Sequence, residues 1–376
     1  MLAAGTAAQA SFSTFTLGLP AIAPALRAEY DLGLTGIGVF LAAQWVGLTL
    51  GLLPWGLVTD RVGERRALAA GLAGCGVLVA AAALADGAVA AGALLVVAGA
   101  VGASVQSASG RAVMQWFAPA ERGLAFGIRQ TAVPVGGFVG ALVLPALTSA
   151  GGIGWAFVFV GAFCVATAVV GGIVVRELPS EGVEPGDVPW TLRDSRLWLL
   201  SGGSSMYVAT QGALFAFLVL FLHDEHGLSN ASAAAIFAVS HVFAMGFRIG
   251  VGRWSDVIGS RFVPLRQIGL AMFVSLGVAT VLLDAPTPLV AALLVAATAL
   301  ASAWNGLAFV AAAELSGTRR SGAAIGFQQT ALSFTAVVTP PLFAAIVAAS
   351  SWRAAFAVFA FLPLAGWVLL GRASTS

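Results

Sequence analysis

Long apolar segments, separated by short polar breaks, follow one another along the whole chain. Each holds about 20 residues or more, which is enough for a helix to cross the hydrocarbon core of a bilayer. The pattern predicts an all-α membrane protein with twelve transmembrane helices. We place the spans at 6–28, 34–58, 66–85, 89–116, 122–148, 154–176, 196–222, 230–255, 262–283, 288–315, 320–347 and 351–371.

A polar stretch divides these spans into two groups of six. Residues 177–195 hold most of the isolated Glu, Asp and Pro residues and no apolar run. We therefore predict an N-terminal six-helix bundle over 1–176, a linker over 177–195 and a C-terminal six-helix bundle over 196–376.

Composition supports a lipid-facing exterior. Hydrophobic residues make up 59% of the 376 residues and charged residues only 9%, whereas soluble domains have roughly 25% charged residues. A net charge of +2 gives no argument for binding nucleic acid. The basic residues are all Arg, so the chain lacks the lysine of a P-loop and does not drive transport with its own ATPase. Two Cys and three scattered His match no zinc spacing, and we expect no metal or cofactor.

The distribution of arginine predicts the orientation in the membrane. With the N-terminus inside, thirteen arginines lie in cytoplasmic loops or ends and only Arg27 and Arg353 lie outside, as the positive-inside rule requires. Both termini and the linker 177–195 are therefore expected to be cytoplasmic. The Lys-free, Ala- and Gly-rich usage is typical of a GC-rich bacterium, and we therefore expect the protein in a bacterial inner membrane.

The two halves repeat each other's sequence. The segment from Gly56 to Arg65 matches that from Gly252 to Arg261, and Gly127–Thr131 matches Gly326–Thr330, at offsets of 196 and 199 residues. Such repeated six-helix halves are typical of carriers that work by alternating access, with the substrate held between the halves near mid-membrane.

The repeated segments resemble the loop motif G-x-x-x-D-R-x-G-R-R/K of the major facilitator superfamily, and the resemblance extends over the whole chain. It implies a secondary transporter in which the motif gates the cytoplasmic side. The first copy departs from the family pattern at Glu64. The matching residues are Gly56, Asp60, Arg61, Gly63, Arg65 and Arg66 in the first copy, and Gly252, Asp256, Gly259 and Arg261 in the second.

The chemistry of the motif can be argued from the residues themselves. Gly56 permits close helix approach, and Gly63 permits a tight turn between two helices. An Asp such as Asp60 can accept hydrogen bonds from Arg or from a helix N-terminus of the opposite half. Because such contacts exist only when that side is shut, they would favour one access state. The alternative is a plain positive-inside loop.

Charged groups inside a span cost about 3 kcal/mol each by insertion scales, so each needs an explanation. The embedded set is Arg111, Arg129, Arg248 and His241, with Glu314 near the inner end of its span, and no Asp or Glu lies mid-span. Positive charge without an acidic partner favours an anionic ligand. The alternative is that these arginines snorkel toward the cytoplasmic headgroups, and Arg248 could also pair at the helix end.

We expect Arg129 to bind the negative group of the substrate, helped by Arg111 at similar depth. Gln130 beside it, and Gln329 from the opposite half, would add hydrogen bonds, while Pro134 frees backbone groups one turn further on. The remaining polar candidates either line the central cavity or form hydrogen bonds between helices. They are Gln328, Asn305 and His241. For His241 the two interpretations are a proton carrier and a core histidine with a single hydrogen bond.

Glycine pairs spaced by four residues predict close helix contacts. They occur at Gly47/Gly51, Gly136/Gly140 and Gly246/Gly250.

These observations together predict a carrier for a small organic or inorganic anion, coupled to protons. The alternative is a proton-coupled exporter of drugs or metabolites, which should have an acidic residue in its central cavity. Span 5 matches the antiporter motif of the family only in part, at Pro134, Gly136 and Gly137. A receptor or membrane enzyme would need a large domain outside the membrane, and the longest loop is under about twenty residues. The partners expected are the lipid bilayer, the small-molecule substrate and a proton.

Overall fold

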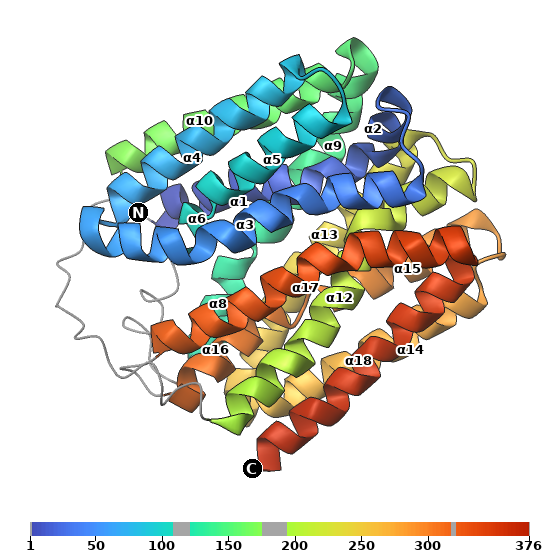
Figure 1. Ribbon diagram of the computed structural model, residues 1–376. Coiled ribbons are helices and arrows are strands. Elements are labelled where there is room, and N and C mark those ends of the chain that lie inside the picture. The colour runs from blue at the N-terminus through green and yellow to red at the C-terminus, as the bar shows by residue number, and fades with distance from the viewer. Residues whose placement is uncertain (1, 108–120, 175–193, 317–320, 376) are drawn as a thin grey trace.

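The computed structural model describes residues 2–107, 121–174, 194–316 and 321–375. In these ranges the secondary structure is helical throughout (Figure 1). The N-terminal half contains α1 (Leu2–Gly18), η1 (Leu19–Ile22), α2 (Ala23–Glu29), α3 (Leu34–Val62), α4 (Glu64–Ala81), η2 (Ala82–Leu84), α5 (Ala88–Gly102), α6 (Ser104–Ser107), α8 (Arg122–Gln130), α9 (Ala132–Gly151) and α10 (Ile153–Val174). The C-terminal half contains α12 (Ser195–Asp224), α13 (Asn230–Ile258), α14 (Phe262–Val281), α15 (Thr287–Ala301), α16 (Asn305–Ser316), α17 (Ser321–Ala349) and α18 (Trp352–Thr375).

Eleven helical segments of the described ranges are long and apolar enough to cross a membrane. They correspond to the second through twelfth predicted spans. The first predicted span forms as three pieces, α1, η1 and α2, because Pro20 and Pro24 lack the N–H that a continuous helix needs. The predicted all-α fold with two six-helix halves is therefore confirmed. The boundaries at 176 and 195 stay a prediction, since residues 175–193 lie outside the described part.

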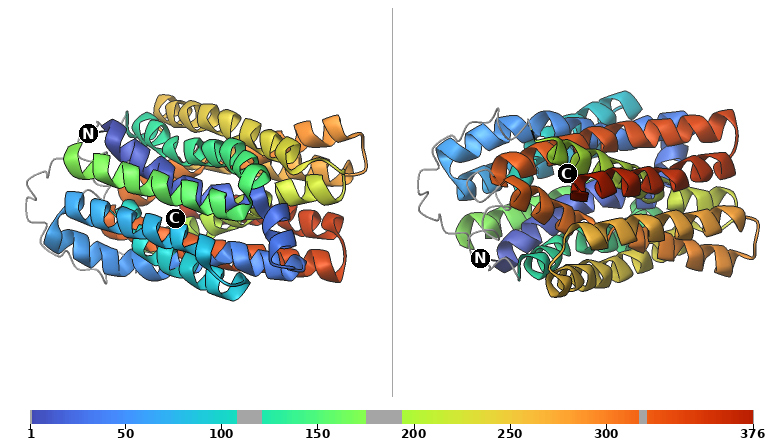
Figure 2. Two further views of the ribbon diagram at one scale, coloured as in Figure 1. Left: turned by 90° about the horizontal axis from the view of Figure 1, so that it is seen from above. Right: turned by 90° about the horizontal axis from the view of Figure 1, so that it is seen from below.

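All the long helices run along one axis of the molecule (Figures 1 and 2). The first and last helices have their free ends at the same end of the bundle, which we call the terminal end (Figure 1). The turn from α3 to α4 and the turn from α13 to α14 lie there as well. The other end, with the α2–α3 and α12–α13 turns, is called the opposite end.

The two halves meet along two seams that the internal repeat relates. In one seam α3 packs on α17, and in the other α13 packs on α8 and α9. Because α3 and α13 are repeat mates, as are the α8–α9 pair and α17, each half offers the same two spans to the other. The predicted repeat is thus visible as two matched interfaces.

Two of the three glycine pairs make the close contacts that their spacing predicts. A side chain on Gly47 or Gly51 would collide with the backbone of α5, and one on Gly136 or Gly140 with the backbone of α1. The prediction is wrong for Gly246 and Gly250. Both are exposed on α13, with no described atom within 4 Å of an added Cβ.

Large apolar side chains are exposed along the outer faces of the helices. Leu53, Val89, Ile173 and Val257, on α3, α5, α10 and α13, are each more than two-thirds exposed. So much apolar surface on every side is incompatible with a water-facing exterior and suits contact with lipid tails.

Candidate functional site: a buried arginine between the two halves

Arg248 lies in α13, at the seam with α8 and α9, and its side chain is only 3% exposed. It comes ten residues before the end of α13 at Ile258, which is roughly 15 Å from the terminal end at 1.5 Å per residue. A guanidinium at that depth cannot have its usual hydration, so its hydrogen bonds must come from the protein or from a ligand.

Three acceptors on three different chain segments hold the guanidinium. Nη1 donates to the backbone carbonyl of Gln130 at 2.6 Å, which belongs to the N-terminal half. Nε donates to the carbonyl of Ser302 at 2.8 Å, and Nη2 to Oδ1 of Asn305 at 3.2 Å. Arg248 therefore joins the two halves through neutral oxygen atoms.

The sequence explains why these two carbonyl oxygens are available. In a continuous helix the carbonyl of Gln130 would accept from the N–H of residue 134, but Pro134 has no N–H. The chain accordingly breaks between α8 and α9 at Thr131. Ser302 lies in the break between α15 and α16, where its carbonyl has likewise left the helical ladder.

Arg248 differs from the other arginines whose ion pairs the structure describes. Arg27, Arg196, Arg261 and Arg353 each have an Asp or Glu within 4.0 Å. Within the described residues no carboxylate pairs with Arg248, although it is the most buried of the five. Its positive charge is thus solvated by dipoles alone, an arrangement that favours a nearby anion.

The other predicted polar candidates lie in different surroundings. Asn305 belongs to the Arg248 cluster and also donates to Oε1 of Gln211 at 3.4 Å. Gln328 is fully buried and donates to the hydroxyl of Ser204 at 3.2 Å, while Gln329 is half-buried on α17. No hydrogen bond between Gln130 and Gln329 occurs among the described residues.

The side chains of two predicted arginines lie outside the described residues. Arg111 lies outside the described residues, and only the backbone of Arg129 in α8 is described. His241 is fully buried, two turns along α13 from Arg248, between Phe215 and Phe237.

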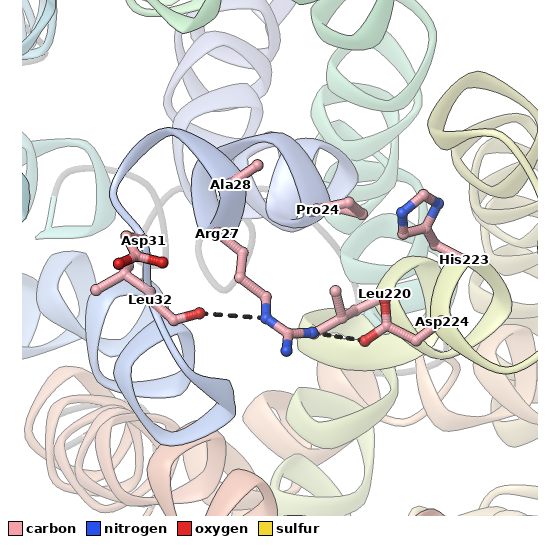
Figure 3. A pocket seen from close by; sticks show the side chains of 8 residues that line it. All are labelled: Pro24, Arg27, Ala28, Asp31, Leu32, Leu220, His223 and Asp224. Atoms are coloured by element: carbon pink, nitrogen blue, oxygen red, sulfur yellow. Dashed lines mark hydrogen bonds and ion pairs between the residues drawn. The ribbon is translucent and has the colours of Figure 1, made fainter.

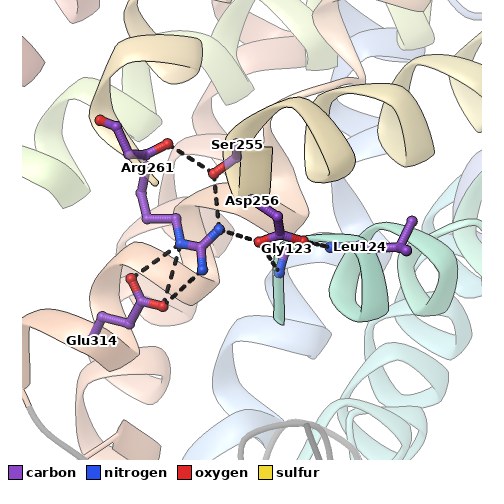
Figure 4. A network of polar contacts seen from close by, with 7 residues as sticks. Gly123, Leu124, Ser255, Asp256, Arg261 and Glu314 are labelled. Atoms are coloured by element: carbon purple, nitrogen blue, oxygen red, sulfur yellow. Dashed lines mark hydrogen bonds and ion pairs between the residues drawn. The ribbon is translucent and has the colours of Figure 1, made fainter. Parts of the chain in front are cut away.

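The second copy of the loop motif forms a charged network at the terminal end (Figure 4). Asp256, at the end of α13, accepts hydrogen bonds from the backbone N–H groups of Gly123 at 3.1 Å and Leu124 at 2.8 Å. These groups belong to the first turn of α8, so a carboxylate of the C-terminal half caps a helix of the N-terminal half. The Asp256 side chain is completely buried by this contact.

Arg261 completes the network. Its guanidinium lies between Asp256 and Glu314 and also donates to the hydroxyl of Ser255 (Figure 4). Burial opposes the charge of Arg261, but the hydrogen bonds and charges of Glu314 and Asp256 outweigh that effect and raise its pKa. Glu314 is therefore the partner of a loop arginine and lies at the helix end, on the terminal side of Arg248.

Gly63 adopts the turn conformation that the sequence predicts, and Gly259, its counterpart in the second motif copy, also has a positive φ. Gly63 has φ 86° between α3 and α4, and Gly259 has φ 65° at the end of α13, a region that glycine occupies without strain. Gly56, by contrast, does not serve the predicted close approach, because no described atom lies within 4 Å of an added Cβ.

The charged residues of the first copy are described only in part. Arg65 donates to the backbone carbonyl of Gly172 in α10, and Arg66 is exposed. The side chains of Asp60 and Arg61 lie outside the described residues.

At the opposite end a different ion pair joins the halves (Figure 3). Arg27 of α2 donates to Asp224 at the end of α12 at 2.7 Å, and its Nε donates to the carbonyl of Leu32 at 3.2 Å. The two charged side chains are 34% and 25% exposed. They line a pocket of about 300 Å³, which His223 and Asp31 also border.

Several of these residues are missing from the sequence candidates. Gln211 is a polar residue inside an apolar span, so the test that selects Asn305 would also select it. Arg27 and Asp224 are 197 residues apart and no pattern links them. Ser302 acts through its backbone, at a helix break without a proline, and leaves no sequence signal either.

Comparisons with known proteins agree with this arrangement. The sequence model of the Major Facilitator Superfamily matches residues 4–335. The uncharacterised MFS-type transporter Rv2994 of Mycobacterium tuberculosis is 32% identical over 364 residues, which cover 95% of this chain and 81% of that protein. The MFS-type transporter pytF of Aspergillus terreus is 30% identical over 152 residues, covering 39% of this chain and 51% of pytF.

Two solved structures share the fold across almost their whole length. The human organic anion transporter MFSD10 (TETRAN) superposes with a TM-score of 0.77 at 16% identity, over 98% of this chain and 97% of that one. A bacterial homologue of the human lysosomal transporter Spinster, in an inward-facing and occupied conformation, gives 0.72 at 17% identity, over 100% and 96%.

The chain belongs to the major facilitator superfamily. It is a multi-pass integral membrane protein and a secondary transporter of a small-molecule substrate, and its relatives are transporters rather than enzymes.

Proposed function

We propose that this carrier moves a small organic or inorganic anion, with a proton as second substrate, by alternating access in a bacterial inner membrane. The observation behind the proposal is the environment of Arg248, a buried guanidinium on the seam between the halves with no carboxylate partner among the described residues.

The hydrogen bonds of Arg248 leave capacity for a ligand. A guanidinium has five N–H donors, and the protein uses three of them. Two parallel donors suit the two oxygens of a carboxylate, sulfonate or phosphate. Arg129, one residue before Gln130, and Arg111 are the further candidates for the same anion, as the sequence suggests.

The competing hypothesis, a drug exporter that exchanges for protons, has less support. Such a carrier needs an acidic residue in its central cavity to bind a cation or a proton. Glu314, the acidic residue closest to mid-span in the sequence, is exposed and paired with Arg261 at the terminal end. The similarity in fold to an organic anion transporter, at 16% identity, supports the fold and adds nothing about the substrate.

We further propose that the terminal end faces the cytoplasm, because the sequence puts thirteen arginines on that side. A single cysteine replacing Ser374 should then resist an impermeant thiol reagent in intact cells, while one replacing Ser350 should react. Both positions are exposed, at the terminal and the opposite end respectively, and the native Cys75 and Cys164 are buried. The reverse result would invert the orientation.

Anion binding is tested by thermal unfolding of the purified protein with sulfate, phosphate, succinate or benzenesulfonate, and with ethidium as the cationic comparison. An anion at 100 times its Kd should add about 2.7 kcal/mol to the free energy of unfolding. Arg248→Gln should lose this stabilisation. Arg248→Lys keeps the charge without the planar fork and should weaken binding on the order of tenfold, about 1.4 kcal/mol.

The matched control is Arg353→Gln, which removes an arginine whose partner Asp284 belongs to the same half. It should bind the anion as the wild type does. Stabilisation by ethidium and by no anion would contradict the proposal and support the exporter hypothesis.

A further inference from the structure

His241 is the most unusual buried group in the described part of the chain after Arg248. It lies in α13 seven residues before Arg248, which is two helical turns and roughly 10 Å along the same face. Its side chain is 0% exposed. It therefore lies deeper in the bundle than Arg248 and on the same seam.

The imidazole packs directly against the other half. Gly137 of α9 provides the space, since a Cβ on that residue would collide with the ring. Phe215 of α12 and Phe237 of α13 approach edge-on, with ring centroids 5.2 Å and 4.5 Å away. The His241 ring of the C-terminal half thus occupies the space that the missing side chain of Gly137 leaves in the N-terminal half.

Neither ring nitrogen has a hydrogen-bond partner among the described residues. Leaving a buried polar group unpaired costs about 1–3 kcal/mol. A phenylalanine would fill the same space between Phe215, Phe237 and Gly137 without that cost. Packing alone therefore gives no reason for a histidine at this position.

The cost disappears when the seam opens. Alternating access requires α13 to move away from α9, and the movement would expose the ring to water at the level of Gly137. Water can then satisfy both nitrogens and exchange a proton with them, and imidazole titrates near neutral pH in water. A protonated ring gains more hydration free energy than a neutral one when the seam opens. Proton binding and the access state are therefore linked.

We propose that His241 is the proton-binding residue of a proton–anion symport, an inference that rests on the anion transport proposed above. The protonated ring and Arg248 would place two positive charges on one face of α13. An anion between them stabilises both, so the proton raises the affinity for the anion and the anion raises the affinity for the proton by the same factor. Each cycle takes one proton from one side onto the ring and releases it to water on the other.

No other titratable group competes with His241 at this level of the described structure. The elements η1, α9 and α15, which pack on α13, contain no ionisable residue. The other helices that pack on α13 do carry ionisable residues, but these lie at other levels of the bundle than Phe215 and Gly137. They are Arg196, Tyr207, His223 and Asp224 on α12, Arg266 on α14, Glu314 on α16, and Arg122 and Arg129 on α8.

The chain has only three histidines, so His241 can be observed by itself. In a His223→Gln, His226→Gln variant with isotope-labelled histidine in nanodiscs, NMR should detect one protonation step between about pH 5 and 8. The anion, sulfate or benzenesulfonate, whichever stabilises the wild type, is then added to saturation. It should move the protonation step to higher pH by about one unit, which corresponds to tenfold tighter anion binding by the protonated form. A ring that stays neutral throughout would overturn the inference.

Transport gives the second test. In proteoliposomes, His241→Gln should lose uptake driven by a pH gradient and keep anion counterflow, which needs no net proton movement. His226→Gln, at the opposite end beside Thr287, should keep both. If Arg248-dependent anion binding persists but leaves the His241 titration unmoved, the inference fails and the anion carrier stands. If no anion binds at any pH although the ring titrates, the symport and the proposed substrate fail together.

Discussion

The terminal end and the opposite end join the two halves by contacts of different kinds. At the terminal end, Asp256 is fully buried and bonds two backbone N–H groups of α8 as well as Arg261. At the opposite end, Arg27 and Asp224 form one ion pair that remains partly open to solvent. A hydrogen bond to a charged group, such as each of the two from α8 to Asp256, contributes about 1.5–3 kcal/mol, whereas an exposed ion pair contributes about 0–1 kcal/mol.

From this difference we infer that the opposite end opens more easily. We expect the buried network to favour the state in which the terminal end is closed, and the exposed pair to oppose opening of the other end only weakly. A ligand then has to overcome unequal barriers on the two sides. The following changes would break or sharpen this comparison.

The largest effect is expected from Asp256→Asn. The substitution keeps the shape but removes the charge that caps α8 and pairs with Arg261. The closed terminal end should lose about 1.5–3 kcal/mol, because a neutral amide oxygen accepts the two N–H groups of α8 more weakly than a carboxylate does. The loss should be seen as faster thiol labelling of a cysteine replacing the half-buried Ala125 in α8. Asp284→Asn, which changes an 89% exposed carboxylate within one half, is the control and should label as the wild type does. Equal labelling of both variants would show that Asp256 does not hold that end.

A smaller effect at the same seam is expected from Pro134→Ala. The alanine would offer an N–H to the Gln130 carbonyl inside one continuous helix and so compete with Arg248. A hydrogen bond to a charged group contributes about 1.5–3 kcal/mol, and partial loss should raise labelling at position 125 by roughly tenfold. Pro145→Ala, also inside α9, removes a proline far from Arg248 and should leave labelling unchanged. Identical behaviour of the two proline variants would contradict the assigned role of the Gln130 carbonyl.

The smallest effect is expected from Arg27→Gln. The opposite end should become less stable by about 0–1 kcal/mol, measured as labelling of a cysteine replacing the buried Leu220 beside the pocket. In 1 M salt, where charges are screened beyond about 3 Å, the wild type should approach the variant. A larger loss than that caused by Asp256→Asn would reverse the comparison between the two ends.

Much of the fold follows from the sequence because it depends on local pattern. The length of the apolar segments sets the spans, and the constant offset between the halves reveals their repeat. The backbone freedom of glycine sets the turns at Gly63 and Gly259. The failure at Gly246 and Gly250 marks the limit. Spacing by four residues puts both glycines on one face of α13, but nothing in the sequence says that this face points outward.

The candidate site was harder to predict for the same reason. Arg253 follows Arg248 by five positions, so the sequence permits a snorkelling side chain. Only the position of α8 across the seam, and of the α15–α16 break beside α13, shows that the side chain points inward. The proline four residues after Gln130 was the one local sign that a carbonyl would be free. The ion pair of Arg27 and Asp224 depends on how the halves meet, which no local pattern encodes.

The central claim, that the carrier moves anions, is tested most directly by uptake into proteoliposomes containing the purified wild-type protein. Labelled sulfate, phosphate, succinate and benzenesulfonate would be compared with ethidium, against liposomes without protein. The account predicts saturable uptake of at least one anion, stimulated by an acidic exterior, and no transport of ethidium. Transport of ethidium with no uptake of any anion would contradict it.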